Sequence, residues 1–110
     1  MAPVIMGTPD RPDLADELTD SFCRTDPAKA RVFARTTFLS DNRRDLPRVT
    51  VPTLVIETAQ DAIAPREVSA YVHEHIEGSL LVTLNTTGHC PQLSAPQDTA
   101  DAIAEFVRTT

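Results

Sequence analysis

The sequence predicts an α/β fold in which two parallel strands alternate with two helices. Two short runs of apolar and β-branched residues, 51–56 and 80–84, have the composition of strands buried inside a parallel sheet. Each run is followed by a segment with apolar residues at helical spacing, 66–76 after the first strand and one beginning at Pro96 after the second. Because parallel strands need a crossover connection, this order places both strands in one sheet with a helix between them.

The first part of the chain, residues 1–48, is expected to be helical and to contain no strand. Apolar residues recur at helical spacing over about 11–23, which predicts an amphipathic helix. Asp26 and Pro27 have the residue types favoured at the N-cap and at the first position of a helix. A second helix is therefore expected to begin there and to end near residues 38–40.

Composition and charge exclude several classes of function. The 16 acidic residues outnumber the 10 basic ones, so neither nucleic acid nor an anionic membrane surface is an expected partner. No run approaches the roughly 18–20 apolar residues of a membrane-spanning helix. Cys23 and Cys90 lack metal-site spacing and are too few for a disulfide scaffold, which predicts reduced thiols in the cytoplasm. His73 and His75 lie two positions apart on a predicted helix, so they cannot share a metal ion.

Two residues with acid–base chemistry follow the predicted strands. Asp61 comes after the first strand and His89 after the second. The carboxyl ends of parallel strands lie at one edge of a sheet, where ligand sites of open α/β folds are found, so the two side chains can meet. A carboxylate that accepts a hydrogen bond from an imidazole forms with it the acid–base pair that activates a serine nucleophile. Either residue alone is more often structural, as a capping aspartate or an exposed loop histidine; their joint occurrence in this order favours catalysis.

The serine that such a pair would activate is not evident in these 110 residues. In α/β-hydrolases the nucleophile lies on a Gly-x-Ser-x-Gly turn and precedes the acid and the histidine. Cys90 has Gly88 before it but Gln92 after it, and its position between His89 and Pro91 is not expected to form a strand-to-helix elbow. The nucleophile is therefore expected to come from outside this sequence. The serines that lack the required glycines are Ser21, Ser40, Ser69, Ser79 and Ser94.

Motifs spread over nearly the whole chain resemble those of a known family. The matching segments are Pro9–Pro12, Phe22–Pro27, Phe38–Asp41, Asp45–Pro52, Asp61–Pro65 and Gly88–Pro91. They resemble the RsbQ-like stress-sigma-factor regulators and the plant strigolactone and karrikin receptor hydrolases, which are members of the α/β-hydrolase superfamily. The last two segments are typical of the superfamily, and the earlier ones indicate the narrower family.

The resemblance implies the C-terminal part of an α/β-hydrolase fold. Residues 1–45 would form part of the helical cap, and residues 46–110 would supply the last two parallel strands and two helices of the core. Asp61 and His89 would be the acid and base of a Ser-His-Asp triad acting on a small hydrophobic ester, lactone or similar ligand. Neither a metal nor an organic cofactor is implied.

The resemblance also implies pocket residues and partners. Met6, Phe33 and Phe38 are the candidates to line the substrate pocket. Because residues 1–6 resemble the interior of a cap helix and its exit, a truncated or split hydrolase is expected, inactive without the N-terminal half that holds the nucleophile. One alternative is a regulator component that binds a stress-regulator phosphatase. Another is a gene fragment without function, whose unpaired sheet edge would favour aggregation.

Overall fold

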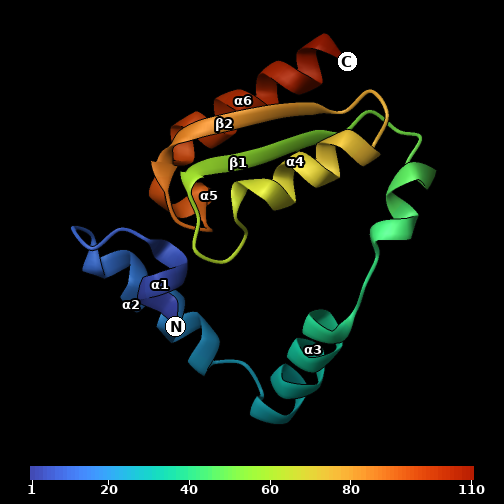
Figure 1. The fold of residues 1–110 in the computed structure, drawn as a ribbon. Coiled ribbons are helices and arrows are strands. Elements are labelled where there is room, and N and C mark those ends of the chain that lie inside the picture. Colours follow the sequence, from blue (N-terminus) through green and yellow to red (C-terminus); the bar gives the residue numbers. More distant parts are fainter.

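The computed structural model describes all 110 residues as a small α/β unit preceded by a run of helices. The sheet lies between helix α4 (Arg66–His75) on one face and helix α6 (Pro96–Thr109) on the other (Figure 1). Helices α1 (Ala2–Met6) and α2 (Pro12–Cys23) lie near the end of the sheet that carries the loops after both strands, whereas α3 (Pro27–Leu39) lies apart from the sheet and continues through η1 (Arg43–Arg48) to the start of the first strand (Figure 1). The predicted strand–helix–strand–helix order is confirmed.

The sheet consists of two parallel strands, β1 (Leu54–Gln60) and β2 (Leu80–Thr87). The first strand begins later than predicted because Pro52 has no N–H to donate to a ladder. Both strands also run past their apolar segments into threonine, asparagine and glutamine, which the paired backbone tolerates. Near its end β2 contains one residue more than β1, a bulge located just before the loops that carry Asp61 and His89.

Three helices complete the α/β unit: α4 (Arg66–His75), the single turn α5 (Pro91–Ser94) and α6 (Pro96–Thr109). Proline opens both α5 and α6, where its missing N–H has no intrahelical partner to lose. Ile76, Leu84 and Thr99 are buried among these elements. The helices predicted at 66–76 and from Pro96 are confirmed, and α5 is an additional element.

The N-terminal half is helical, as predicted. It contains α1 (Ala2–Met6), α2 (Pro12–Cys23), α3 (Pro27–Leu39) and a 3₁₀ helix, η1 (Arg43–Arg48). The carboxylate of Asp26 accepts hydrogen bonds from the N–H groups of Ala28 and Lys29, so it is the N-cap that the sequence predicts. The expected division into a cap over residues 1–45 and a core over 46–110 stays a prediction. None of the helices is long and apolar enough to cross a membrane.

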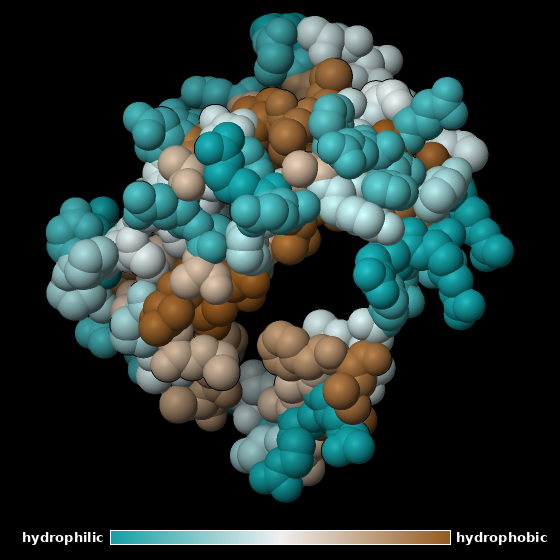
Figure 2. Space-filling view, viewed as in Figure 1, coloured by the Kyte–Doolittle hydropathy of each residue, from teal (hydrophilic) through white to brown (hydrophobic).

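Helix α3 has an apolar surface that nothing in the chain covers. No residue of this helix is buried. Its exposed hydrophobic residues are Val32, Phe33, Phe38 and Leu39. Figure 2 shows an opening between this part of the chain and the α/β unit, with hydrophobic side chains along its rim.

Leu84 and Leu80 form a matched pair for testing where the small core lies. Both are on β2, but Leu84 is 7% exposed and Leu80 is 51% exposed. Leu84→Ala is expected to lower the free energy of unfolding by about 2–4 kcal/mol, since it removes buried apolar atoms and leaves a cavity. Leu80→Ala is expected to cost much less. Urea denaturation of both variants measures the difference, and equal losses would contradict this core.

Candidate functional site

The structure brings Asp61 and His89 into direct contact at the carboxyl end of the sheet. Asp61 follows β1, His89 follows β2, and Nδ1 of the imidazole lies 2.8 Å from Oδ2 of the carboxylate. An ionised carboxylate only accepts hydrogen bonds, so Nδ1 carries the proton. In the neutral imidazole this leaves Nε2 as the basic nitrogen. Nε2 makes no hydrogen bond to the protein, and the His89 side chain is 43% exposed, so it is accessible to a reacting group.

The Asp61 carboxylate is held by its own loop. Oδ1 accepts the backbone N–H groups of Ile63 at 2.8 Å and of Ala64 at 3.0 Å. This is the turn that an aspartate side chain forms with the backbone that follows it. Pro65 then begins α4 as its N-cap. Both carboxylate oxygens are therefore occupied, one by the backbone and one by His89.

These contacts determine the charge of Asp61. Burial of its side chain, which is 12% exposed, would by itself raise the pKa of Asp61. Hydrogen bonds from the N–H of Ala64, the imidazole of His89 and the N–H of Ile63 outweigh that effect, so the pKa lies below its ordinary value. Asp61 is consequently ionised at neutral pH, as an acid that orients a histidine must be.

The loop that carries His89 is attached to β1 by two hydrogen bonds. The N–H of Gly88 donates to the carbonyl of Gln60 at 2.6 Å, and the hydroxyl of Thr58 donates to the carbonyl of Gly88 at 2.8 Å. Thr58 is 3% exposed, so this bond is shielded from water. Sequence reasoning missed Thr58, although a hydroxyl inside a buried strand just before Asp61 was a usable signal.

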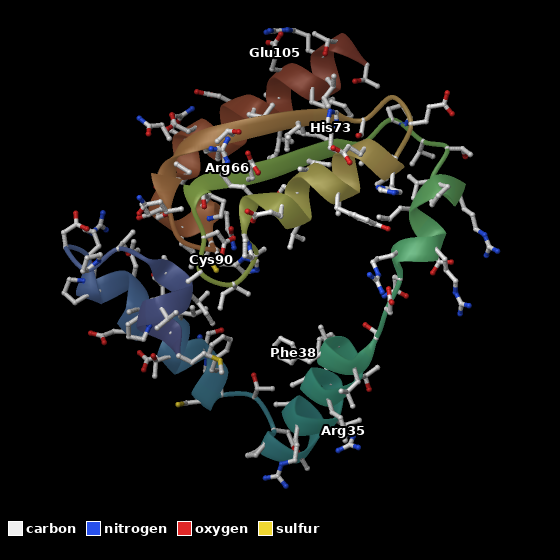
Figure 3. The ribbon with its side chains drawn as sticks, in the orientation of Figure 1. Arg35, Phe38, Arg66, His73, Cys90 and Glu105 are labelled. Atoms are coloured by element: carbon white, nitrogen blue, oxygen red, sulfur yellow. The ribbon has the colours of Figure 1, made fainter.

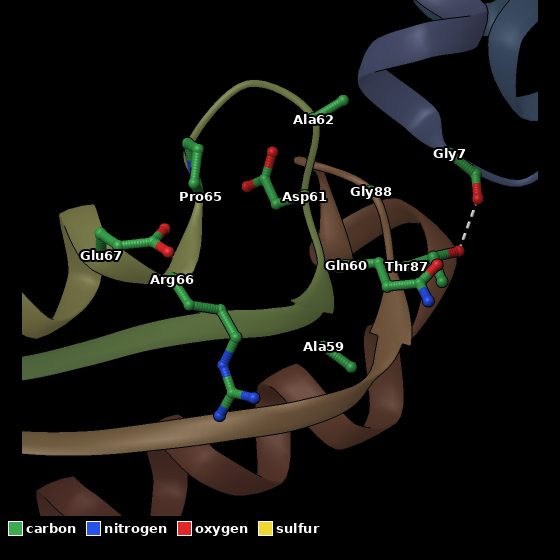
Figure 4. A pocket seen from close by; sticks show the side chains of 10 residues that line it. All are labelled: Gly7, Ala59, Gln60, Asp61, Ala62, Pro65, Arg66, Glu67, Thr87 and Gly88. Carbon is green, nitrogen blue, oxygen red and sulfur yellow. Dashed lines mark hydrogen bonds between the residues drawn. The ribbon is translucent and has the colours of Figure 1, made fainter.

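A hollow beside Asp61 forms the remaining surface of the site (Figure 4). Its walls come from the ends of both strands, the start of α4 and Gly7. Arg66 lines it and pairs through Nε with Oε1 of Glu57 at 3.3 Å, and the same oxygen accepts the hydroxyl of Thr83 at 2.7 Å. The other oxygen of Glu57 is buried without a partner. The lining mixes polar side chains with glycine, alanine and proline, and it holds no serine.

Cys90 occupies a position that differs from the sequence-based expectation. It lies between the end of β2 and the start of α5, as the N-cap of that short helix, so it does stand between a strand and a helix (Figure 3). Its φ of −120° nevertheless lies outside the left-handed region. Burial raises the pKa of the Cys90 thiol, and the charge of Asp61 raises it further, against the effect of a hydrogen bond with Gln92. A thiol that stays protonated is a poor nucleophile. The thiol chemistry of Cys90 therefore argues against it as the nucleophile, although the sequence-based reason did not hold.

The three expected pocket residues do not lie together. Met6 is only 1% exposed and lines none of the hollows described for this structure. Phe33 lines a shallow hollow on α3, and Phe38 projects from the same helix toward the opening (Figure 3). Their role in substrate binding stays a prediction, which the burial of Met6 does not favour.

The two histidines of α4 have separate partners. Nδ1 of His73 lies 2.8 Å from the hydroxyl of Ser79. His75 stacks on the ring of Tyr71, and its Nδ1 lies 2.7 Å from the carbonyl of that residue. No three side chains of histidine, cysteine, aspartate or glutamate are arranged to hold a metal ion.

Comparison with known proteins connects this geometry to one family. A model described as the alpha/beta hydrolase family matches residues 2–102. Strigolactone esterase D14 from Arabidopsis thaliana is 40% identical over 108 residues, which are 97% of this chain and 39% of the relative. Karrikin insensitive 2 receptor IA from Petunia hybrida is 35% identical over 111 residues, which are 96% of this chain and 39% of the relative.

A solved structure shows the same arrangement. A hydrolase from Oleispira antarctica superposes with a TM-score of 0.93 at 35% identity, over 99% of this chain and 40% of that protein. The chain thus spans about two fifths of the length of the relatives it matches, 39% of the curated proteins and 40% of the solved one.

The lowered pKa of Asp61 predicts how stability depends on pH. A carboxyl group whose pKa is lower in the folded chain stabilises the fold fully above its unfolded pKa of about 4, and this contribution is lost as the pH falls through the folded pKa. The difference in free energy of unfolding between the protein and Asp61→Asn is therefore expected to be largest above about pH 4 and to shrink on acidification. Urea denaturation at a series of pH values measures it. Asp20→Asn, at a side chain without hydrogen bonds, is the control, and the same pH profile for both variants would contradict the prediction.

Proposed function

Because this chain belongs to the α/β-hydrolase family, we propose that Asp61 and His89 are the acid and base of a Ser-His-Asp triad. The substrate is a small hydrophobic ester or lactone. The observation that carries the proposal is the 2.8 Å contact between Nδ1 of His89 and Oδ2 of Asp61, which leaves Nε2 free. The order of the two residues along the chain supports the same assignment.

In each half of the proposed reaction His89 takes up one proton and then releases it. Nε2 takes the proton of a serine hydroxyl as its oxygen attacks the carbonyl carbon of the ester, and Asp61 stabilises the imidazolium that forms. The imidazolium then gives this proton to the oxygen of the leaving alcohol as the carbon–oxygen bond breaks. A water molecule hydrolyses the acyl-enzyme by the same two steps and regenerates the serine. Side chains and water suffice for this chemistry, so no metal or organic cofactor is proposed.

The nucleophile and the oxyanion-hole donors of the proposed enzyme lie outside these 110 residues. The sequence contains no Gly-x-Ser-x-Gly turn, and the chain spans 39% of its curated relatives. We therefore propose that it works as part of a truncated or split hydrolase, completed by an N-terminal half. The apolar surface of α3 would then face the substrate, with Phe33 and Phe38 as its aromatic residues.

A second candidate function is a regulator component that acts through protein contact. The exposed apolar side chains of α3, which include Val32, Phe33, Phe38 and Leu39, favour it because such surfaces commonly bind other proteins. The proposed partner is a stress-regulator phosphatase. In this case the chain would act by binding, and the pair of Asp61 and His89 would not need to catalyse hydrolysis.

The enzyme proposal is tested by complementation. The purified chain alone is expected to leave a p-nitrophenyl ester intact, and mixing it with an N-terminal half of a family hydrolase that carries Gly-x-Ser-x-Gly is expected to produce hydrolysis. In the mixture, Asp61→Asn and His89→Ala are each expected to lower kcat by about a thousandfold or more, because the serine loses its oriented base. His73→Ala, at a histidine with a different partner, is the control. Hydrolysis by the chain alone that His89→Ala abolishes would contradict the proposed split.

The regulator proposal is tested by direct binding. Calorimetry with a purified stress-regulator phosphatase is expected to show an association that the double variant Phe33→Ala/Phe38→Ala weakens by about tenfold or more, because aromatic side chains dominate such contacts. Replacing two exposed residues of α2, Asp16→Asn and Glu17→Gln, is the control. Absence of binding by the unaltered chain would rule out this partner.

A further inference from the structure

The first seven residues of the chain contact the loop that carries His89. The backbone N–H of His89 donates to the carbonyl of Ile5 at 2.6 Å. Next to it, the hydroxyl of Thr87 donates to the carbonyl of Gly7 (Figure 4). These contacts join segments eighty or more positions apart, and the resemblance to hydrolases did not indicate them.

The end of α1 explains why these carbonyls are available. The last four carbonyl groups of an α-helix have no partner inside the helix. In α1 the chain leaves the helix at Gly7, whose left-handed backbone, φ 59°, serves as the C-cap. The carbonyls of Ile5 and Gly7 then find their donors in the histidine loop rather than in α1.

Glycines at the contact let the two backbones approach closely. A Cβ atom added to Gly88 would lie 1.7 Å from the carbonyl oxygen of Met6. A Cβ on Gly7 would lie 2.9 Å from both Cα and N of Gly88. Gly88 also has φ 95°, which residues with side chains rarely adopt. The segment containing α1 and the histidine loop therefore pack backbone against backbone, with no room for a side chain at Gly88.

We propose that residues 1–7 are a positioning element that holds the loop of His89 so that its imidazole meets Asp61. The loop is held on one side by β1, through Gln60 and Thr58, and on the other by the carbonyl of Ile5. The use of this position in catalysis rests on the proposed function, but the positioning itself can be measured without catalysis.

The positioning element acts on the base and not on the acid. Asp61 is oriented by the N–H groups of Ile63 and Ala64 in its own loop. His89, in contrast, depends on α1, and α1 packs closely against α2. A movement of the N-terminal helices would consequently displace the base while leaving the acid in place, which breaks the pair from one side.

Substitution of glycines in the full chain tests this inference. Gly88→Ala is expected to push the loop away from Met6. The NMR resonance of the His89 Nδ1 proton would then be lost, and the pKa of Asp61 would rise toward its ordinary value. Gly78→Ala is the matched control, because Gly78 has a similar φ of 73° but nothing within 4 Å of an added Cβ. Both signals are expected to persist in the control, so backbone strain alone does not account for the effect.

A milder substitution guards against a variant that fails to fold. Thr87→Val removes only the hydroxyl that bonds to Gly7, and is expected to speed solvent exchange of the His89 backbone N–H by about tenfold. The inference is overturned if the Nδ1 proton and the pKa of Asp61 are unchanged in Gly88→Ala, or if exchange is unchanged in Thr87→Val. The two proposals can fail separately. If Gly88→Ala loses these signals but the unaltered chain shows no hydrolysis in the complementation assay, the positioning is upheld and the triad is rejected.

Discussion

The parallel pairing of β1 with β2 determines where every candidate catalytic group lies. Because the strands run in the same direction, the loops that follow them emerge at one edge, and the bulge in β2 adjusts their ends. Asp61 and His89 then meet through loops of only a few residues. If the strands slipped by one residue, side chains would change faces and the two loops would no longer be level. The backbone ladder is therefore as important for the acid–base pair as the pair's own hydrogen bond.

The two residues of the pair are held by different kinds of interaction. Asp61 is oriented by N–H groups two and three positions further along, so its geometry is encoded locally. His89 is oriented by β1 and by the end of α1, which are distant in sequence. The acid therefore depends on a short motif, whereas the base depends on tertiary structure.

This difference explains how much the sequence could predict. The strands, the main helices and the edge at which Asp61 and His89 lie follow from hydrophobic patterning and the geometry of parallel sheets. The strand ends were predicted less well because pairing extends through polar residues such as Thr58. Contacts made by backbone carbonyls, such as that of Ile5, leave no trace in residue types, and only Gly7 and Gly88 signal that two backbones approach. Cys90 was misplaced because a single turn of helix, α5, has no periodicity to detect.

The contact between Ile5 and His89 also has a consequence for the order of folding. Closing a loop of some eighty residues costs conformational entropy that short-range contacts do not, and contacts between distant segments slow folding. The turn at Asp61 needs only its own loop and can form as soon as β1 and α4 do. The histidine loop also needs the contact between Ile5 and His89, which joins segments distant in sequence. The acid is therefore expected to be ordered by local contacts, whereas the base is expected to be ordered only once the long-range contacts of the fold have formed.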